Sequence, residues 1–280
     1  MYRQFQLKNS IGETLDLNGS KSLFTTPQGL GYQQTNNMAS IGDGFYINVK
    51  KTWPKVSVIG VIAFGGDDPY ADYVEFVDFI NKGYDLTLAY APRSVTYYSE
   101  IDIEYINKGE LNNIGVLEIP ISMARKTPWY KITPQTVNIV PGSGGNVSTF
   151  DLVYDYEFID ENTDGEATVV SLGHIPASLE VIVPGALTNP SITLLDSNGA
   201  TLGKMELTGN VGAGEKLIYS SKYLSPGVWI DDDEQIDNLN INNENFFRVP
   251  MGETCSLVVA SEGVVNLTAT VNLYNYYRSV

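Results

Sequence analysis

The residues best suited to catalysis do not form a recognisable catalytic motif in this sequence. His174 is the sole histidine and lies in SLGHIPASLE, which we expect to be a loop before a strand. A Ser-His-Asp triad would depend on this histidine, but no Gly-x-Ser-x-Gly nucleophile elbow accompanies it. The HExxH, CxxC, Walker A and GxGxxG motifs are also absent. We therefore predict that the protein is not an enzyme.

One acidic segment resembles half of a calcium-binding loop. In DENTDG, Asp160, Asn162 and Asp164 occupy positions 1, 3 and 5 of such a loop, and Gly165 occupies position 6. Position 12 would be Ser171, so the bidentate glutamate is missing. We interpret Asp160 to Gly165 as a polar turn and predict no metal and no cofactor, with calcium as the open alternative.

A second acidic segment, WIDDDEQIDN at residues 229–238, could bind a cation or a basic partner. Its carboxylates gather at Asp231, Asp232, Asp233 and Glu234. Most such runs are solvated loops. We predict a loop here that could face a partner.

The segment LEIPISMARKTPWYK, residues 117–131, joins a strand to a basic and aromatic cluster. Arg125 and Lys126 are followed by Thr127, Pro128, Trp129 and Tyr130. Proline ends a strand ladder, and Trp and Tyr are favoured where chains or domains meet. We predict a subunit or domain interface at Arg125, Lys126, Trp129 and Tyr130, where the first domain ends and the chain turns toward the second.

The charge of the chain excludes several functions. The 280 residues carry a formal net charge of −16, whereas general nucleic-acid and anionic-membrane binding need basic surfaces. The one cysteine, Cys255, excludes an intramolecular disulfide and lies in the apolar run CSLVVA, so we expect it to be buried. We expect a protein that folds in a reducing cytoplasm.

Period-two alternation predicts a mainly β protein with one helix. The segment GGDDPYADYVEFVDFINKG has a capping aspartate, Pro69 for the first turn and apolar residues at helical spacing, which predicts a helix over about 69–82 that covers a sheet. The Asn198-Gly199 pair predicts a tight hairpin. The uncharged TPQTVNIVPGSGGNVS segment predicts a linker at 136–145, between an N-terminal domain at 1–135 and a C-terminal domain at 146–280.

The order of these segments resembles the distal tail (Dit) proteins of siphoviruses that infect Gram-positive bacteria. The similar segments are MYRQFQLKNSIGETLDLN, YADYVEFVDFINKG, YDLTLAYAP, VLEIPISMARKTPWYK, NPSITLLDSNGATLGKMELTGNVGAGEKLIYSS and GVVNLTATVNLYNYY, which span nearly the whole chain.

The resemblance implies a hub protein of the tail tip, or baseplate, in the virion, assembled in the host cytoplasm. It implies an N-terminal β domain that forms a homo-hexameric ring, and a galectin-like or carbohydrate-module-like C-terminal β-sandwich. Its partners would be the tail tube protein, the tail-associated (Tal) protein and the receptor-binding protein. DNA would pass through the ring without being bound, and no membrane would be involved.

Two other functions stay open. The acidic and aromatic β composition suits a carbohydrate-binding protein that adheres to host cell-surface glycans. A glycan hydrolase would need two facing carboxylates, which 33 acidic residues could supply but sequence spacing cannot demonstrate.

Overall fold

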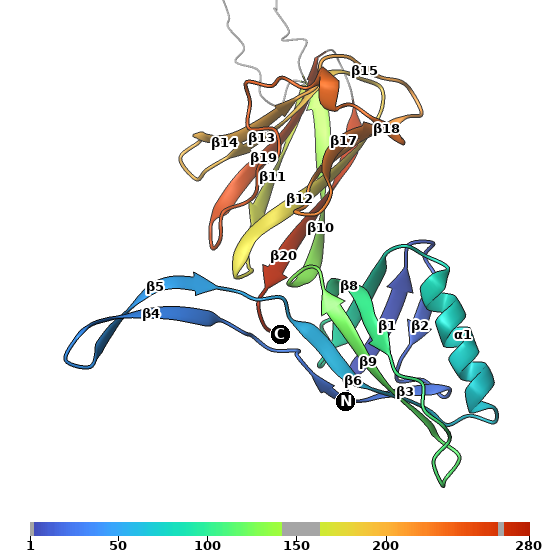
Figure 1. Ribbon diagram of the computed structural model, residues 1–280. Helices are drawn as coiled ribbons and strands as arrows, with labels where there is room; N and C mark the ends of the chain where they lie inside the picture. Colours follow the sequence, from blue (N-terminus) through green and yellow to red (C-terminus); the bar gives the residue numbers. More distant parts are fainter. Residues whose placement is uncertain (1–2, 142–162, 263–265) are drawn as a thin grey trace, which may run out of the picture. The chain divides into compact units, whose positions relative to one another are not determined.

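The computed structural model describes residues 3–141, 163–262 and 266–280 and divides the chain into two compact units (Figure 1). The first unit comprises Met1–Lys131 with Tyr277–Val280, and the second comprises Ile132–Tyr276. The chain passes from one unit to the other within β10 and returns at the end of β20. The last four residues therefore belong with the N-terminal unit, although sequence alone places them in the C-terminal domain.

The predicted linker is wrong over its first half. Residues 136–141 are the second half of strand β10, and 142–145 lie outside the described residues. Val137 and Ile139 alternate with polar neighbours and are fully or almost fully buried. The proline and glycine content of the whole window hid this short alternating pattern.

The first unit is a curled antiparallel sheet. Hydrogen bonding joins seven of its strands in the order β2, β1, β7, β8, β9, β6, β3. Its elements are β1 (Gln4–Asn9), β2 (Thr14–Asp16), β3 (Ser22–Gln28), β4 (Thr35–Gly42), β5 (Phe45–Thr52), β6 (Ser57–Phe64), α1 (Pro69–Asn81), β7 (Leu86–Ala91), β8 (Tyr97–Ile106), β9 (Leu117–Arg125) and the start of β10 (Trp129–Pro141).

The inner face of this sheet encloses the core of the first unit. Phe5 of β1 and Phe24 of β3 meet edge to face with ring centroids 5.0 Å apart, which shows how far the sheet curls. The alternation of buried and exposed residues along β1 and β6 directs one apolar row inward. The single predicted helix is confirmed as α1, which covers this core through Phe76 and Phe79. Asp68 caps it by accepting a hydrogen bond from the Ala71 N–H at 3.0 Å.

The second unit is a β-sandwich, so the predicted mainly β fold is confirmed. One sheet contains β11, β19, β13 and β14, and the other contains β18, β17, β16, β12 and β20. Its elements after β10 are β11 (Thr163–Val170), β12 (Ile175–Pro184), β13 (Leu187–Leu195), β14 (Thr201–Glu206), β15 (Asn210–Val211), β16 (Lys216–Ser221), β17 (Pro226–Ile230), β18 (Asp233–Glu234), the 3₁₀ helix η1 (Ile236–Asn238), β19 (Thr254–Glu262) and β20 (Leu267–Tyr277).

The core of the second unit lies between its two sheets. Leu257 and Ile192 from one sheet and Leu179, Leu217 and Val271 from the other belong to the same buried cluster. Cys255 is buried in this cluster, as expected. A specifically galectin-like sandwich stays a prediction. Within the described residues, no helix has the length and apolar character needed to cross a membrane.

Candidate assembly surfaces

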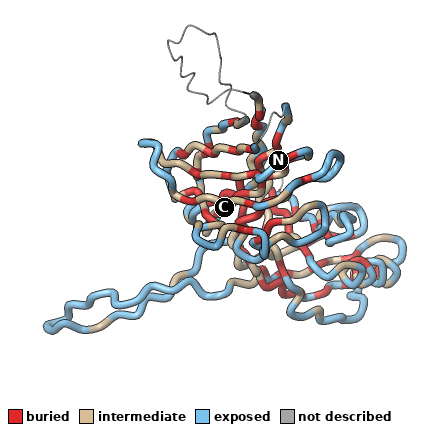
Figure 2. The backbone as a smooth tube through the Cα atoms, turned by 90° about the horizontal axis from the view of Figure 1, so that it is seen from above, coloured by how far each residue is buried: buried red, intermediate tan, exposed pale blue. Residues whose placement is uncertain are grey.

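A two-stranded arm in the first unit offers the most accessible apolar surface of the described chain. It consists of β4 and β5, which pair only with each other and turn at Asp43 and Gly44. Both turn residues have positive φ angles, 46° and 81°, which Asp tolerates and Gly adopts freely. Figure 2 shows the arm as an almost continuously exposed ribbon that extends away from the red core.

The arm exposes large apolar side chains that nothing in the first unit covers. Phe45 is 68% exposed, Val49 62% and Ile47 51%. An isolated two-stranded hairpin is at best marginally stable in water. The arm therefore has the apolar composition of a contact surface, but no other part of the first unit packs against it.

The arm also carries two exposed neighbouring lysines, Lys50 and Lys51. Lys50 and Lys51 at its base make no ion pair among the described residues. Both lie in a chain of net charge −16. Acidic groups on another chain would therefore be attracted to the arm.

The predicted interface residues hold the base of this arm. The Trp129 side chain is fully buried, and its indole N–H donates to the Leu30 carbonyl oxygen at 3.0 Å. The Arg125 guanidinium lies 5.1 Å from the centre of the Trp129 ring, and its Nη2 is 3.5 Å from the Gly31 carbonyl oxygen. Leu30 and Gly31 lead directly into β4, so these side chains fix where the arm leaves the sheet.

The chain that returns from the arm is held as well. The Arg125 backbone N–H donates to the Val56 carbonyl oxygen at 3.0 Å. The Arg278 guanidinium lies 3.9 Å from the centre of the Trp53 ring. An arginine over an indole face combines cation–π attraction with stacking. Both ends of the arm are therefore attached to the body of the first unit.

Arg125 is a partly buried cation that makes no ion pair among the described residues. Its Nε and Nη1 atoms are buried and make no hydrogen bond among the described residues. Burial disfavours the charged guanidinium and lowers the pKa of Arg125 to about 10. The group remains a cation at neutral pH, held by the Trp129 ring instead of a carboxylate.

The other two predicted interface residues also have contacts within the first unit. Lys126 Nζ pairs with Asp85 at 3.1 Å and with Asp102 at 3.3 Å. Burial opposes the ammonium charge, but these carboxylates outweigh it and raise the pKa of Lys126. The Tyr130 ring is buried and lies 5.8 Å from the Tyr98 ring. A subunit-facing role for these residues stays a prediction.

The predicted acidic loop is a tight hairpin. Asp231 and Asp232 form the turn between β17 and β18, and Asp233 and Glu234 make up β18. Asp231 has a φ of 51° and accepts a hydrogen bond from the Lys216 N–H at 3.2 Å. All four side chains are exposed, and their role toward a partner stays a prediction.

The half-calcium loop is only partly described. Asp160 to Asn162 lie outside the described residues, whereas Asp164 and Gly165 lie in β11 and pair with Ala260 and Val259. Within the described ranges, no group of three or more His, Cys, Asp or Glu side chains is placed to hold a metal. His174 lies just before β12, and its backbone N–H donates to the Tyr276 carbonyl oxygen at 2.7 Å.

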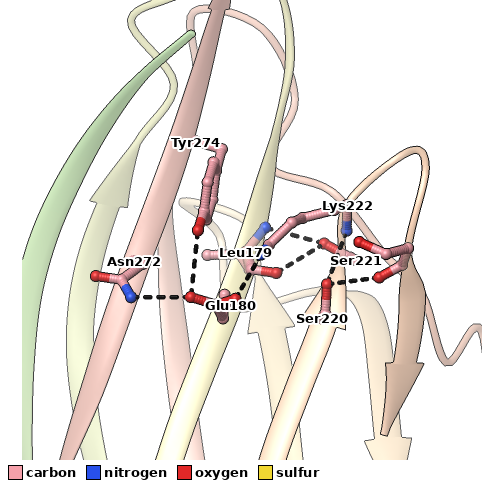
Figure 3. Close-up of polar contacts among 8 residues, drawn as sticks. Leu179, Glu180, Ser220, Ser221, Lys222, Asn272 and Tyr274 are labelled. Carbon is pink, nitrogen blue, oxygen red and sulfur yellow. Dashed lines mark hydrogen bonds and ion pairs between the residues drawn. The ribbon is translucent and has the colours of Figure 1, made fainter. Parts of the chain in front are cut away.

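Figure 3 shows a polar cluster on β12, β16 and β20 of the second unit, centred on Glu180. The Glu180 carboxylate pairs with Lys222 Nζ at 2.5 Å and accepts hydrogen bonds from Asn272 at 3.0 Å and Tyr274 at 3.2 Å. Burial raises the pKa of Glu180, but the three donors outweigh burial and lower it overall. Each carboxylate oxygen has at least one donor, so the cluster connects β12 to β20 and to the residue that follows β16.

A polar groove of about 820 Å³ lies on the other sheet of the second unit. Glu206 in this groove accepts hydrogen bonds from Lys204, Asn240 and Asn243, which hold its pKa at about 2. The residues that line the groove include no aromatic side chain on which a sugar could stack. Glycan binding therefore stays a prediction.

The sequence analysis did not predict the protruding arm, although it contained the turn and one of the two strands. The Asp43-Gly44 turn and the strand pattern of residues 46–51 both appear in the sequence. In β5, Phe45, Ile47 and Val49 alternate with Asn48 and Lys50, which is the pattern of a strand that covers a core, so the sequence carried no signal that this face would be exposed.

The described chain thus consists of two β units, and the first of them carries an exposed apolar arm. Residues 4–126 match the family model of the N-terminal domain of distal tail proteins. This part of the chain, which nearly coincides with the first unit, therefore has the sequence pattern of a distal tail protein N-terminal domain.

Two solved phage structures share the fold of the whole chain. A chain of the phage P2 baseplate in its activated conformation with Ca has 15% identity and a TM-score of 0.69, with 100% of both chains covered. The SPP1 Dit protein, a hub of the adsorption apparatus in phages infecting Gram-positive bacteria, has 10% identity and a TM-score of 0.57, with 96% of this chain and 98% of that chain covered. No curated protein sequence matches the chain.

Proposed function

We propose that this protein is the hub of the tail tip and forms a hexameric ring. The ring would continue the tail tube and carry the tail-associated and receptor-binding proteins on its other surfaces. The exposed apolar arm is the observation that carries this proposal. An exposed apolar arm that contacts a different surface of the next copy supplies a head-to-tail contact, and such contacts can close into a ring.

The geometry of the arm favours contact between two different surfaces of neighbouring copies. The arm is one element of the first unit, and a partner surface elsewhere on the same unit makes a head-to-tail contact. A head-to-tail contact closes into a ring when the rotation that relates neighbouring copies is a whole fraction of 360°. The attached base of the arm supports this proposal, because a fixed direction of exit favours one rotation over many.

The charge of the chain agrees with a channel for DNA. A lumen that binds DNA would obstruct its passage, and a protein of net charge −16 lacks the basic surface that binding needs. The charge and the fold do not indicate where the Tal and receptor-binding proteins would bind. These two partners are proposed from the resemblance to the family alone.

The mass of the purified chain in solution tests the proposal. We expect light scattering behind a sizing column to give a species near six times the chain mass of 30.7 kDa, with rings visible by negative stain. The matched control replaces residues 35–52 by a short Gly-Ser linker, and this variant should remain folded and monomeric. A full-length chain that stays monomeric at high concentration, with and without the tail tube protein as a template, would contradict the ring.

A further inference from the structure

The base of the arm is held by residues that lie next to the two crossings of the chain between the units. The chain leaves the first unit after Lys131 and returns to it at Tyr277. Trp129, which holds the outgoing end of the arm, comes just before the first crossing. Arg278, which holds the returning end, comes just after the second. Both attachments of the arm therefore depend on the two segments that join the units.

The segment after the second crossing, Tyr277–Val280, is folded onto the first unit. We call it the C-terminal strap. Tyr277 and Val280 pack against the core of the first unit. The Tyr277 ring also meets the Tyr97 ring edge to face, with ring centroids 5.4 Å apart. Because aromatic pairs in this arrangement stabilise a contact beyond the area they bury, the strap is an integral part of the first unit.

Arg278 of the strap reaches the returning end of the arm. Its guanidinium lies 3.9 Å from the centre of the Trp53 ring, and Trp53 directly follows β5. Trp53 is 47% exposed, so this stacking is a surface contact. An arginine stacked on an exposed indole favours the attached state by a factor of about 2 to 5. The strap therefore favours one position of the returning end without locking it.

The outgoing end of the arm is in contact with the returning end. Trp129 is fully buried and fixes the outgoing end through its hydrogen bond to the Leu30 carbonyl oxygen. At Gly29, just before that point, an added Cβ would lie 2.0 Å from the carbonyl oxygen of Ser57, just after the arm. Because the two backbones lie this close, displacement of the returning end changes the direction in which the arm leaves the first unit.

In the second unit, the two segments that join the units are neighbouring strands. β10 and β20 pair with each other and lie side by side (Figure 1). Asn275, which comes just before the second crossing, is 1% exposed, and its Nδ2 lies 3.5 Å from Oγ1 of Thr133, just after the first crossing. Asn275 Oδ1 also accepts a hydrogen bond from the Leu172 N–H at 2.8 Å. The second unit thus fixes the spacing of the two crossings.

We propose that the second unit controls how firmly the arm is held, through the paired strands β10 and β20 and the C-terminal strap. While the strands stay paired, Trp129 and Arg278 hold the two ends of the arm, and the arm keeps one direction. A change in the second unit that separates the ends of these strands would draw Arg278 away from Trp53 and free the arm. Coupling of this kind needs one element with two states that both sites bias, and here that element is the returning end of the arm, attached or detached. The proposal concerns the single chain and does not depend on the ring.

Distance measurements between two spin labels on the full-length chain test the strap. Labels on Ile47→Cys in the arm and Lys8→Cys on β1, with Cys255→Ala to remove the native thiol, report the direction of the arm within the first unit. The measurement is made at a concentration at which the chain is monomeric, so the result is independent of ring formation. Arg278→Gln should raise the population of displaced arms about threefold and broaden the distance distribution. Arg278→Lys keeps the charge and should give an intermediate width.

The matched control removes another cation from an aromatic ring of the first unit. Lys108 Nζ lies 4.9 Å from the centre of the Tyr70 ring, and neither residue belongs to the strap or to the base of the arm. Lys108→Gln should leave the distance distribution unchanged. An unchanged distribution in Arg278→Gln, or equal broadening in Lys108→Gln, would overturn the proposal.

Substitutions in the second unit test the coupling. Asn275→Ala and Thr133→Val each remove one side of the contact between β10 and β20, and both should broaden the same distribution, although less than Arg278→Gln does. Thr133→Val keeps the buried Asn275 and stays informative if Asn275→Ala unfolds the second unit. Gly199→Ala, which strains a hairpin of the same unit away from these two strands, is the control and should leave the distribution unchanged. If Arg278→Gln frees the arm whereas the β10 and β20 variants do not, the strap acts alone, and control by the second unit is overturned.

Discussion

At the scale of single residues, Arg125 and Trp129 act inside the first unit. Trp129 and Tyr130 are buried just after β9 ends. The subunit or domain interface predicted at these residues stays a prediction. The Leu30 carbonyl that accepts from the Trp129 indole lies 99 residues earlier in the chain, and no local pattern indicates it.

The Trp129→Phe substitution should destabilise the first unit by about 1–3 kcal/mol, because it leaves a void in the core and removes the donor to the partly buried Leu30 carbonyl. Urea unfolding followed by a probe in the first unit measures this loss. Trp53→Phe is the matched control, since Trp53 is 47% exposed, and it should cost about 0.5 kcal/mol or less. If the two substitutions lower the free energy of unfolding equally, the burial and the hydrogen bond of the Trp129 indole do not stabilise the first unit.

At the scale of elements, the Asn-Gly pair in the sequence correctly predicted a hairpin turn. The predicted Asn198-Gly199 hairpin joins β13 to β14. Gly199 has a φ of 81°, and Asp196 Oδ1 accepts hydrogen bonds from the N–H groups of Asn198 and Ala200, each at 2.8 Å. No atom lies within 4 Å of where a Cβ on Gly199 would be. The positive φ angle, and not a lack of space, therefore limits which residues fit there.

Gly199→Ala should therefore destabilise the second unit by about 1 kcal/mol, because a Cβ strains a left-handed backbone. Gly199→Asn is the control at the same position, since Asn tolerates this conformation, and its loss should be clearly smaller. Thermal unfolding of both variants compares them. A loss from Asn that matches the loss from Ala would point to side-chain packing and not to φ as the cause.

At the scale of the whole molecule, the charge of −16 acts against assembly. Copies of like charge repel one another, and salt shortens the range of this repulsion from about 10 Å at 0.1 M to about 3 Å at 1 M. Apolar contact of the exposed arm with another copy would persist in salt. The assembled fraction at a fixed protein concentration should therefore rise between about 0.05 M and 1 M sodium chloride.

Sedimentation velocity measures this fraction directly. The linker variant that lacks residues 35–52 is the control and should sediment as a monomer at every salt concentration. Dissociation of the wild-type assembly by salt would mean that ion pairs, and not apolar burial, dominate the contact between copies.

The sequence by itself determined the β class, the one helix, the main hairpin turn and the family resemblance. These follow from local patterns: alternation along strands, the Asp68 cap and Pro69 of α1, and Asn-Gly at a tight turn. The same local signals misplaced the linker, because β10 continues through residues that the composition assigns to a loop.

Only the tertiary structure decided which surfaces are left uncovered. Phe45 and Phe24 are both strand phenylalanines, yet one is 68% exposed and the other 1%. The difference depends on whether another strand lies across that face, which is settled by contacts between distant parts of the chain. For the same reason, only the tertiary structure shows that Arg125 and Trp129 contact Gly31 and Leu30 at the base of the arm.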